Sequence, residues 1–226
     1  MLNLHLFSTP GKEDYCYILE ASRLVLKGRD NPVVVYIPAG SLSNASQDAT
    51  EKAFHGLVRV ETINTEEMTL AEMEAILRNS ALVYIPGGNT YLLNHRLHTC
   101  KIIDHLSRKV SAGLPVVAFS AGTVLCGPNI LTSNDMNILG TSYFSGLNAT
   151  PLNFSVHYPD DEIARLGKDD WLFNYHVFHE NPVILMADGA YVQVKGKKTS
   201  LVREEAWVKR KGQEKEKLLP GVSIII

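Results

Sequence analysis

Three short apolar runs that do not alternate with polar residues constrain the fold of this chain most strongly. They occupy residues 33–37, 81–85 and 116–119, and each is followed by a turn or by a segment with helical character. Continuous runs of this kind are typical of strands that are buried on both faces of a parallel sheet. Since helical patterns separate them, we predict βαβ units and an α/β fold with a doubly wound, mostly parallel sheet and helices on both faces.

Weaker patterns complete this prediction. Apolar residues at helical spacing predict helices at 15–26, 48–57, 69–77, 91–97, 102–110 and 162–173. β-Branched and aromatic runs predict further strands at 2–8, 58–63, 154–158, 183–186, 190–194, 200–202, 206–209 and 218–226. Glycine turns between the late strands indicate C-terminal β-hairpins. We expect residues 1–226 to form a single domain.

Composition excludes several functional classes. The chain has 226 residues and a formal net charge of -2 from 22 basic and 24 acidic residues, so we expect no nucleic-acid or membrane-surface partner. Apolar runs stay well short of the roughly 20 residues that cross a bilayer, and residues 1–7 do not resemble a signal peptide. Cys16, Cys100 and Cys126 lack metal-ligand spacing. They are typical of reduced thiols in a cytoplasmic protein. The oligomeric state has no signature in the sequence.

The segment Ala118-Phe119-Ser120-Ala121-Gly122 carries the first chemical signal. It resembles the G-x-S-x-G nucleophile elbow, with alanine in the first small position. In such a strand-to-helix turn the serine hydroxyl stands above the sheet edge, and the amide after it (Ala121) can stabilise an oxyanion. Two alternatives remain open at this point. Ser120 could instead cap the following helix. The nearby Cys126 could be the nucleophile, although a cysteine at such a position is more typical of a core residue.

A serine nucleophile needs a base and an orienting carboxylate. His157 ends a short strand before a turn, where an imidazole could be presented over a sheet end. Its competitors His176 and His179 are spaced like a metal pair but have no further ligand cluster nearby. Surface or core positions are expected for the remaining histidines, His5, His55, His95, His98 and His105. Asp188, at a predicted strand end, and Asp135, in a polar loop, are the candidate carboxylates, and spacing does not decide between them.

The turn Gly87-Gly88-Asn89 could supply a second oxyanion donor, because glycine lets the backbone approach a substrate closely. A phosphate-binding loop is the alternative interpretation. The turn matches neither G-x-G-x-x-G nor G-x-x-x-x-G-K-[ST], which argues against nucleotide binding.

Four motifs in order resemble peptidase E, the aspartyl dipeptidase family, whose wider group includes cyanophycinase. They are residues 85–90, 118–122, 134–136 and 187–189. The resemblance implies a serine hydrolase with a class I glutamine amidotransferase-like fold and no cofactor or metal. By position it makes Ser120 the nucleophile, His157 the general base, and the Gly88 and Ala121 amides the oxyanion hole. The family's third member is usually a glutamate in a Pro-Glu-Gly turn. The matching residue here is Asp188, with Asp135 as the fallback orienter.

Substrate preference in this family depends on the stretch that follows the histidine. Family members that cleave after an N-terminal aspartate carry a Gly-Glu-Thr-Arg-like stretch after the histidine. Here residues 158–165 hold three acids, and only Arg165 could supply a cation. Asn89 and Arg165 are the candidate substrate-binding residues. We therefore predict a serine peptidase that hydrolyses short peptides, dipeptidase-like and with an N-terminal Asp-Xaa preference inherited from the family. The alternatives are a non-catalytic peptide- or small-molecule-binding protein with the same fold, and an amidase or esterase that uses the same site.

Overall fold

The structure, a computed structural model, describes residues 1–11, 15–42, 50, 54 and 58–225. Its strands are β1 Asn3–Phe7, β2 Val33–Tyr36, β3 Arg59–Thr62, β4 Leu82–Ile85, β5 Val116–Phe119, β6 Asn153–Tyr158, β7 Val183–Ala187, β8 Tyr191–Lys195, β9 Lys198–Arg203, β10 Ala206–Lys209, β11 Glu216–Lys217 and β12 Ser223–Ile225. Its helices are α1 Cys16–Leu26, α3 Leu70–Arg78, α4 Thr90–Thr99, α5 Ile103–Ser111, α6 Ala121–Leu125 and α7 Glu162–Phe178.

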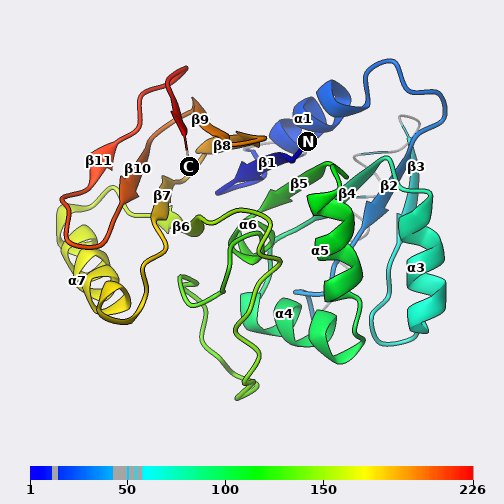
Figure 1. Cartoon of the computed structure of the whole chain (residues 1–226), viewed down its shortest axis with the longest axis horizontal. Coiled ribbons are helices and arrows are strands. Elements are labelled where there is room, and N and C mark those ends of the chain that lie inside the picture. Colours follow the sequence, from blue (N-terminus) through cyan, green and yellow to red (C-terminus); the bar gives the residue numbers. More distant parts are fainter. Residues whose placement is uncertain (12–14, 43–49, 51–53, 55–57, 226) are drawn as a thin grey trace.

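The strands form two sheets (Figure 1). The main sheet has the order β12-β9-β8-β1-β5-β4-β2-β3, and the smaller one the order β11-β10-β7-β6. The predicted fold class, a mostly parallel α/β sheet with helices on both faces, is confirmed. The separate smaller sheet was not predicted, and α7 extends five residues beyond the helix expected at 162–173. The helix expected at 48–57 lies outside the described residues, apart from Thr50 and Phe54.

Parallel pairing brings three strand ends to one edge of the main sheet. β5 lies between β1 and β4, and its register pairs Phe119 with Phe7 and Ala118 with Ile85. Parallel neighbours end on the same side, so the segments that follow Phe7, Ile85 and Phe119 meet there. This is the edge at which open α/β sheets bind ligands.

The apolar runs do not alternate because both faces of the main sheet are covered. In β2, Val34 and Tyr36 pack with α1 on one face, whereas Val35 packs on the opposite face with residues of α3, α4 and α5. A strand buried on both faces has no solvent-facing positions for polar residues.

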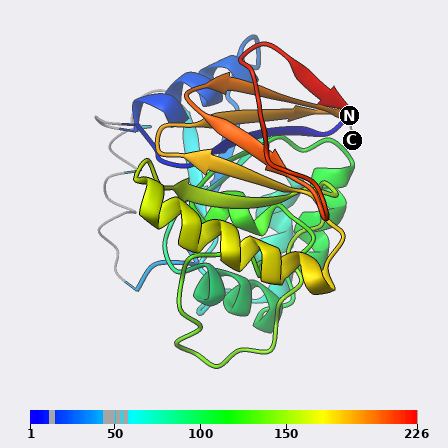
Figure 2. The same cartoon turned by 90° about the vertical axis from the view of Figure 1, so that its left-hand side faces the viewer.

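The smaller sheet packs its inner face into the same core. Phe154, Ile184 and Val208 belong to the cluster that also contains Val35 and the buried residues of α3, α4 and α5. Leu185 and Trp207 lie on the other face of the smaller sheet and pack with residues of α7. Figure 2 shows α7 in front of this sheet. No helix among the described residues is long and apolar enough to cross a bilayer.

Candidate active site

Ser120 stands at a strained turn between β5 and α6. Its φ of 51° and ψ of -116° are unusual for a residue other than glycine. Backbone hydrogen bonds hold this conformation: the Ser120 N–H donates to Phe7 O at 3.0 Å, and the Val124 N–H donates to Ser120 O at 3.1 Å. Within the described part of the chain the Ser120 side chain makes no capping bond to α6. The hydroxyl is therefore available for another partner.

The small residues of the turn allow two backbones to approach each other. A Cβ added to Gly122 would lie 2.2 Å from Ile85 O, and one added to Gly87 would lie 2.8 Å from the Phe119 ring. Both distances are shorter than real Cβ contacts. The Gly122 contact is with the backbone of β4, so only glycine lets α6 lie this close to the end of that strand.

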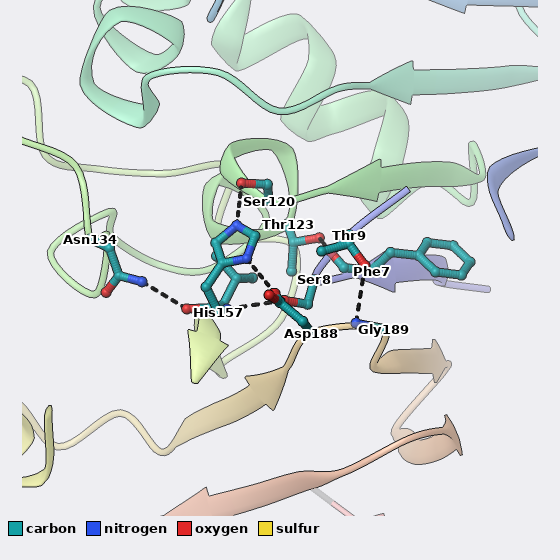
Figure 3. Close-up of polar contacts among 10 residues, drawn as sticks. Phe7, Ser8, Thr9, Ser120, Thr123, Asn134, His157, Asp188 and Gly189 are labelled. Carbon is teal, nitrogen blue, oxygen red and sulfur yellow. Dashed lines mark hydrogen bonds and ion pairs between the residues drawn. The ribbon is translucent and has the colours of Figure 1, made fainter. Parts of the chain in front are cut away.

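The structure brings Ser120, His157 and Asp188 together (Figure 3). His157 Nε2 lies 3.0 Å from Ser120 Oγ, and His157 Nδ1 lies 2.6 Å from Asp188 Oδ1. The serine comes from the main sheet, whereas the histidine and the aspartate lie at the ends of β6 and β7 of the smaller sheet. Because Asp188 accepts the Nδ1 proton, Nε2 is left as the acceptor that faces the hydroxyl. These distances are within hydrogen-bond reach for a nucleophile and its base.

A β-bulge in β6 directs His157 toward the serine. Ser155 pairs with Leu185 but Tyr158 pairs with Ala187, so β6 carries one extra residue between these pairs. His157 lies in this irregular stretch, with a φ of 54°. Bulges commonly re-aim a side chain next to an active site.

Asp135 has a different place. Its Oδ2 accepts hydrogen bonds from the Thr90 N–H at 2.7 Å, from Thr90 Oγ1 at 2.6 Å and from Ser133 Oγ at 3.1 Å. The carboxylate thus ties a polar loop to the start of α4. Of the two candidate carboxylates, the one that contacts His157 is Asp188.

The two candidate oxyanion donors lie beside the serine. Ala121 directly follows Ser120, and Gly88 lines the same pocket of about 290 Å³ as Ser120 and His157. Among the described residues, neither the Gly88 N–H nor the Ala121 N–H has a hydrogen-bond acceptor. Both amides are therefore free to bind a developing negative charge.

The two candidate substrate-binding side chains make contacts within the protein. Asn89 accepts from the Leu92 N–H at 2.9 Å as the N-cap of α4 and donates to Met136 O at 3.2 Å. Arg165 donates from Nε to Pro159 O at 2.6 Å, and its guanidinium lies over the Trp207 ring. In the described part of the chain, neither the Asn89 nor the Arg165 side chain contacts Ser120.

His5, His176 and Cys126 make no contact with Ser120 in the described part of the chain, and His55 lies outside the described residues. His5 is buried in β1, and burial, with a smaller effect from Lys195, lowers its pKa to about 4, so it is a neutral core residue as expected. His176 is buried in α7, with Nδ1 3.2 Å from His179 O. Burial raises the pKa of Cys126 to about 12, so its thiol stays protonated at neutral pH and is a poor nucleophile. Among residues 1–11, 15–42, 50, 54 and 58–225, no three or more His, Cys, Asp or Glu side chains are grouped to hold a metal ion.

The sequence did not indicate a role at the site for Ser8, the last residue of the strand predicted at 2–8, or for Thr9, which follows it. The His157 N–H donates to Ser8 Oγ at 3.0 Å, and Ser8 Oγ donates to Asp188 Oδ1 at 3.3 Å. The Gly189 N–H donates to Thr9 Oγ1 at 3.0 Å. The available signal was a pair of hydroxyl residues at the carboxyl end of a strand, where α/β sheets place functional groups.

A doubly wound sheet with a serine elbow, a histidine and a carboxylate defines the class of serine-type peptidases and related hydrolases. Comparison with known proteins identifies the family. The profile described as Peptidase family S51 matches residues 6–202, and the chain belongs to this family.

Two curated relatives illustrate the relationship. Peptidase E of Nostoc sp. is 26% identical over 222 residues, which cover 94% of this chain and 90% of the relative. A probable alpha-aspartyl dipeptidase of Drosophila melanogaster is 33% identical over 139 residues, 59% of this chain and 58% of the relative. The crystal structure of a peptidase from an acI-B1 Actinobacterium matches the fold with a TM-score of 0.74 at 14% identity, and covers 100% of this chain and 97% of that one. The predicted resemblance to peptidase E is confirmed.

Proposed function

We propose that this chain is a dipeptidase that hydrolyses short peptides through an acyl-enzyme on Ser120. The observation that carries the proposal is the hydrogen-bonded series from Ser120 Oγ through His157 to Asp188. The names of the relatives, peptidase E and alpha-aspartyl dipeptidase, support the substrate class.

The proposed reaction has two halves. His157 Nε2 takes the proton of Ser120 Oγ as the oxygen attacks the scissile carbonyl carbon, and Asp188 stabilises the imidazolium that forms. The Gly88 and Ala121 N–H groups bind the oxyanion, where one such donor contributes about 3 kcal/mol. The imidazolium then gives its proton to the leaving amine. In the second half, water attacks the acyl-enzyme ester, His157 accepts a proton from that water, and the proton returns to Ser120 as the carboxylic acid product leaves.

The size of the pocket supports a short substrate. At about 290 Å³, its volume lies just below the roughly 300–1,000 Å³ found for small-molecule sites. Pro10, Gly88 and Phe119 line it beside Ser120 and His157. A few atoms on either side of the scissile bond would fill this space.

Recognition of an N-terminal aspartate would require a cation at the site. A carboxylate side chain is best recognised by a guanidinium in bidentate contact. Arg165 is held over Trp207 and bonded to Pro159 O, and the acids Asp160, Asp161 and Glu162 lie nearby in the sequence. We therefore propose that kcat/KM for Asp-Xaa exceeds that for neutral dipeptides by less than about tenfold, because Arg165 is engaged elsewhere and does not offer this bidentate contact.

The three free cysteines support a cytoplasmic location.

A dipeptide panel tests this function. The purified chain should hydrolyse Asp-Leu and neutral dipeptides such as Ala-Leu, and Ser120→Ala should lower kcat by about 10⁴-fold or more. Asn89→Ala and Arg165→Ala serve as comparison variants, for which we expect smaller changes. Equal hydrolysis by wild type and Ser120→Ala would contradict the proposal. Binding of dipeptides without turnover would instead favour the non-catalytic alternative, and turnover of amides or esters alone would favour the related hydrolases.

A further inference from the structure

Three consecutive residues at the end of β1 contact all three segments that carry the candidate triad. Phe7 O accepts the Ser120 N–H at 3.0 Å and the Thr123 hydroxyl at 2.8 Å. Ser8 Oγ contacts both His157 and Asp188, and Thr9 Oγ1 accepts the Gly189 N–H at 3.0 Å. Figure 3 shows these contacts converging from the strand end. The end of β1 therefore joins the main sheet, which holds Ser120, to the smaller sheet, which holds His157 and Asp188.

Ser8 uses its hydroxyl as both acceptor and donor. The side chain is fully buried. One lone pair accepts the His157 backbone N–H at 3.0 Å, and the single proton is donated to Asp188 Oδ1 at 3.3 Å. The bulge in β6 interrupts the ladder at His157, so this N–H requires an acceptor from elsewhere. Ser8 supplies it and so stabilises the positive φ of His157.

The carboxylate of Asp188 depends on such contacts because packing does not hold it. Its side chain is 68% exposed, whereas that of His157 is 41% exposed. An exposed carboxylate can rotate unless hydrogen bonds fix it, and Asp188 Oδ1 receives bonds from both His157 Nδ1 and Ser8 Oγ. A hydrogen bond to an ionised carboxylate is stronger than one between neutral groups.

We propose that Ser8 is a positioning residue for the triad. It accepts the His157 N–H and donates to the Asp188 carboxylate, and both contacts serve the hydrogen bond between His157 Nδ1 and Asp188, which turns Nε2 toward Ser120 Oγ. This inference rests on the proposed function of Ser120 as nucleophile. Ser8 does not touch the reacting atoms and acts through Asp188 and His157.

The rate at which a fluorophosphonate labels Ser120 tests this role, because it reports the activation of the serine without requiring a known substrate. Ser8→Ala should slow labelling by roughly tenfold, as small misplacements of catalytic groups do. The matched control is Ser155→Ala. Ser155 is also fully buried and lies on β6 two residues before His157, but its hydroxyl has no hydrogen-bond partner in the described part of the chain. The fluorophosphonate should label the Ser155→Ala variant at the wild-type rate.

A double-mutant cycle separates positioning from general stability. If Ser8 acts through Asp188, then Ser8→Ala should slow labelling by about threefold or less in an Asp188→Ala background, because the effects of substitutions at two contacting residues are not additive. The same loss in both backgrounds, or no loss in the wild-type background, would overturn the inference. Should Ser8→Ala not fold, Ser8→Cys, of similar size and with a weaker donor, is judged by the same two criteria. Absence of labelling in the folded wild type would instead contradict the proposed function, so the two failures are distinguishable.

Discussion

An Asp188→Asn variant is expected to lose about 10⁴-fold in kcat with the fold intact. The Asp188 carboxylate accepts the proton of His157 Nδ1 at 2.6 Å, which leaves Nε2 free to take the proton of Ser120. The asparagine amide can donate to Nδ1 instead, and the neutral imidazole then carries its proton on Nε2, where it cannot act as a base. Steady-state kinetics on the best dipeptide of the panel, with circular dichroism to confirm folding, measure the effect.

Asp135→Asn is the matched control for this prediction, because the same change is made at the other candidate carboxylate. Asp135 accepts the Thr90 N–H and hydroxyl at the start of α4. Losing part of this cap should lower the free energy of unfolding by about 1 kcal/mol and leave kcat within about threefold. A large loss of kcat in Asp135→Asn, with little loss in Asp188→Asn, would reverse the assignment of the carboxylate.

The second large effect is expected from Gly122→Ala. The added methyl group would lie 2.2 Å from Ile85 O and 2.9 Å from Ile85 C, both backbone atoms that cannot rotate away. α6 must then move from β4 and take the Ala121 amide with it. We expect the free energy of unfolding to fall by about 3 kcal/mol or more, and hydrolysis to be lost with it.

Gly167→Ala provides the contrast for that measurement. Gly167 lies inside α7, and a Cβ built on it meets nothing within 4 Å. Alanine is favoured over glycine in a helix by about 0.5–1 kcal/mol, so this variant should be slightly more stable. Urea denaturation of both variants makes the comparison. Equal stability of Gly122→Ala and wild type would show that the close approach of α6 to β4 is not required.

Local patterns predicted most strands and helices but not the second sheet. Residues 154–158 were predicted to form a strand, and β6 occupies Asn153–Tyr158. Its partner β7 is Val183–Ala187, and the two are joined by no turn that would reveal their pairing. The choice of sheet depends on contacts between distant segments, and the apolar runs of β6 and β7 would suit either sheet. The bulge that directs His157 has no local signature either.

The candidate site shows the same division. Ser120 was indicated by its turn and His157 by its strand end, and the structure brings both together with Asp188. Spacing did not distinguish Asp188 from Asp135, because the choice depends on how the smaller sheet packs. Ser8 was missed for the same reason. Its contacts require β1 to end beside β5 and opposite the ends of β6 and β7.

The central claim is that Ser120 is a nucleophile activated by His157. Its most direct test is to treat the folded chain with a fluorophosphonate and to locate the adduct by intact-mass and peptide mass spectrometry. The account predicts one adduct per chain, on Ser120, and much slower labelling in His157→Gln. A folded chain that takes no label, or takes it on another residue while Ser120 stays unmodified, would contradict it.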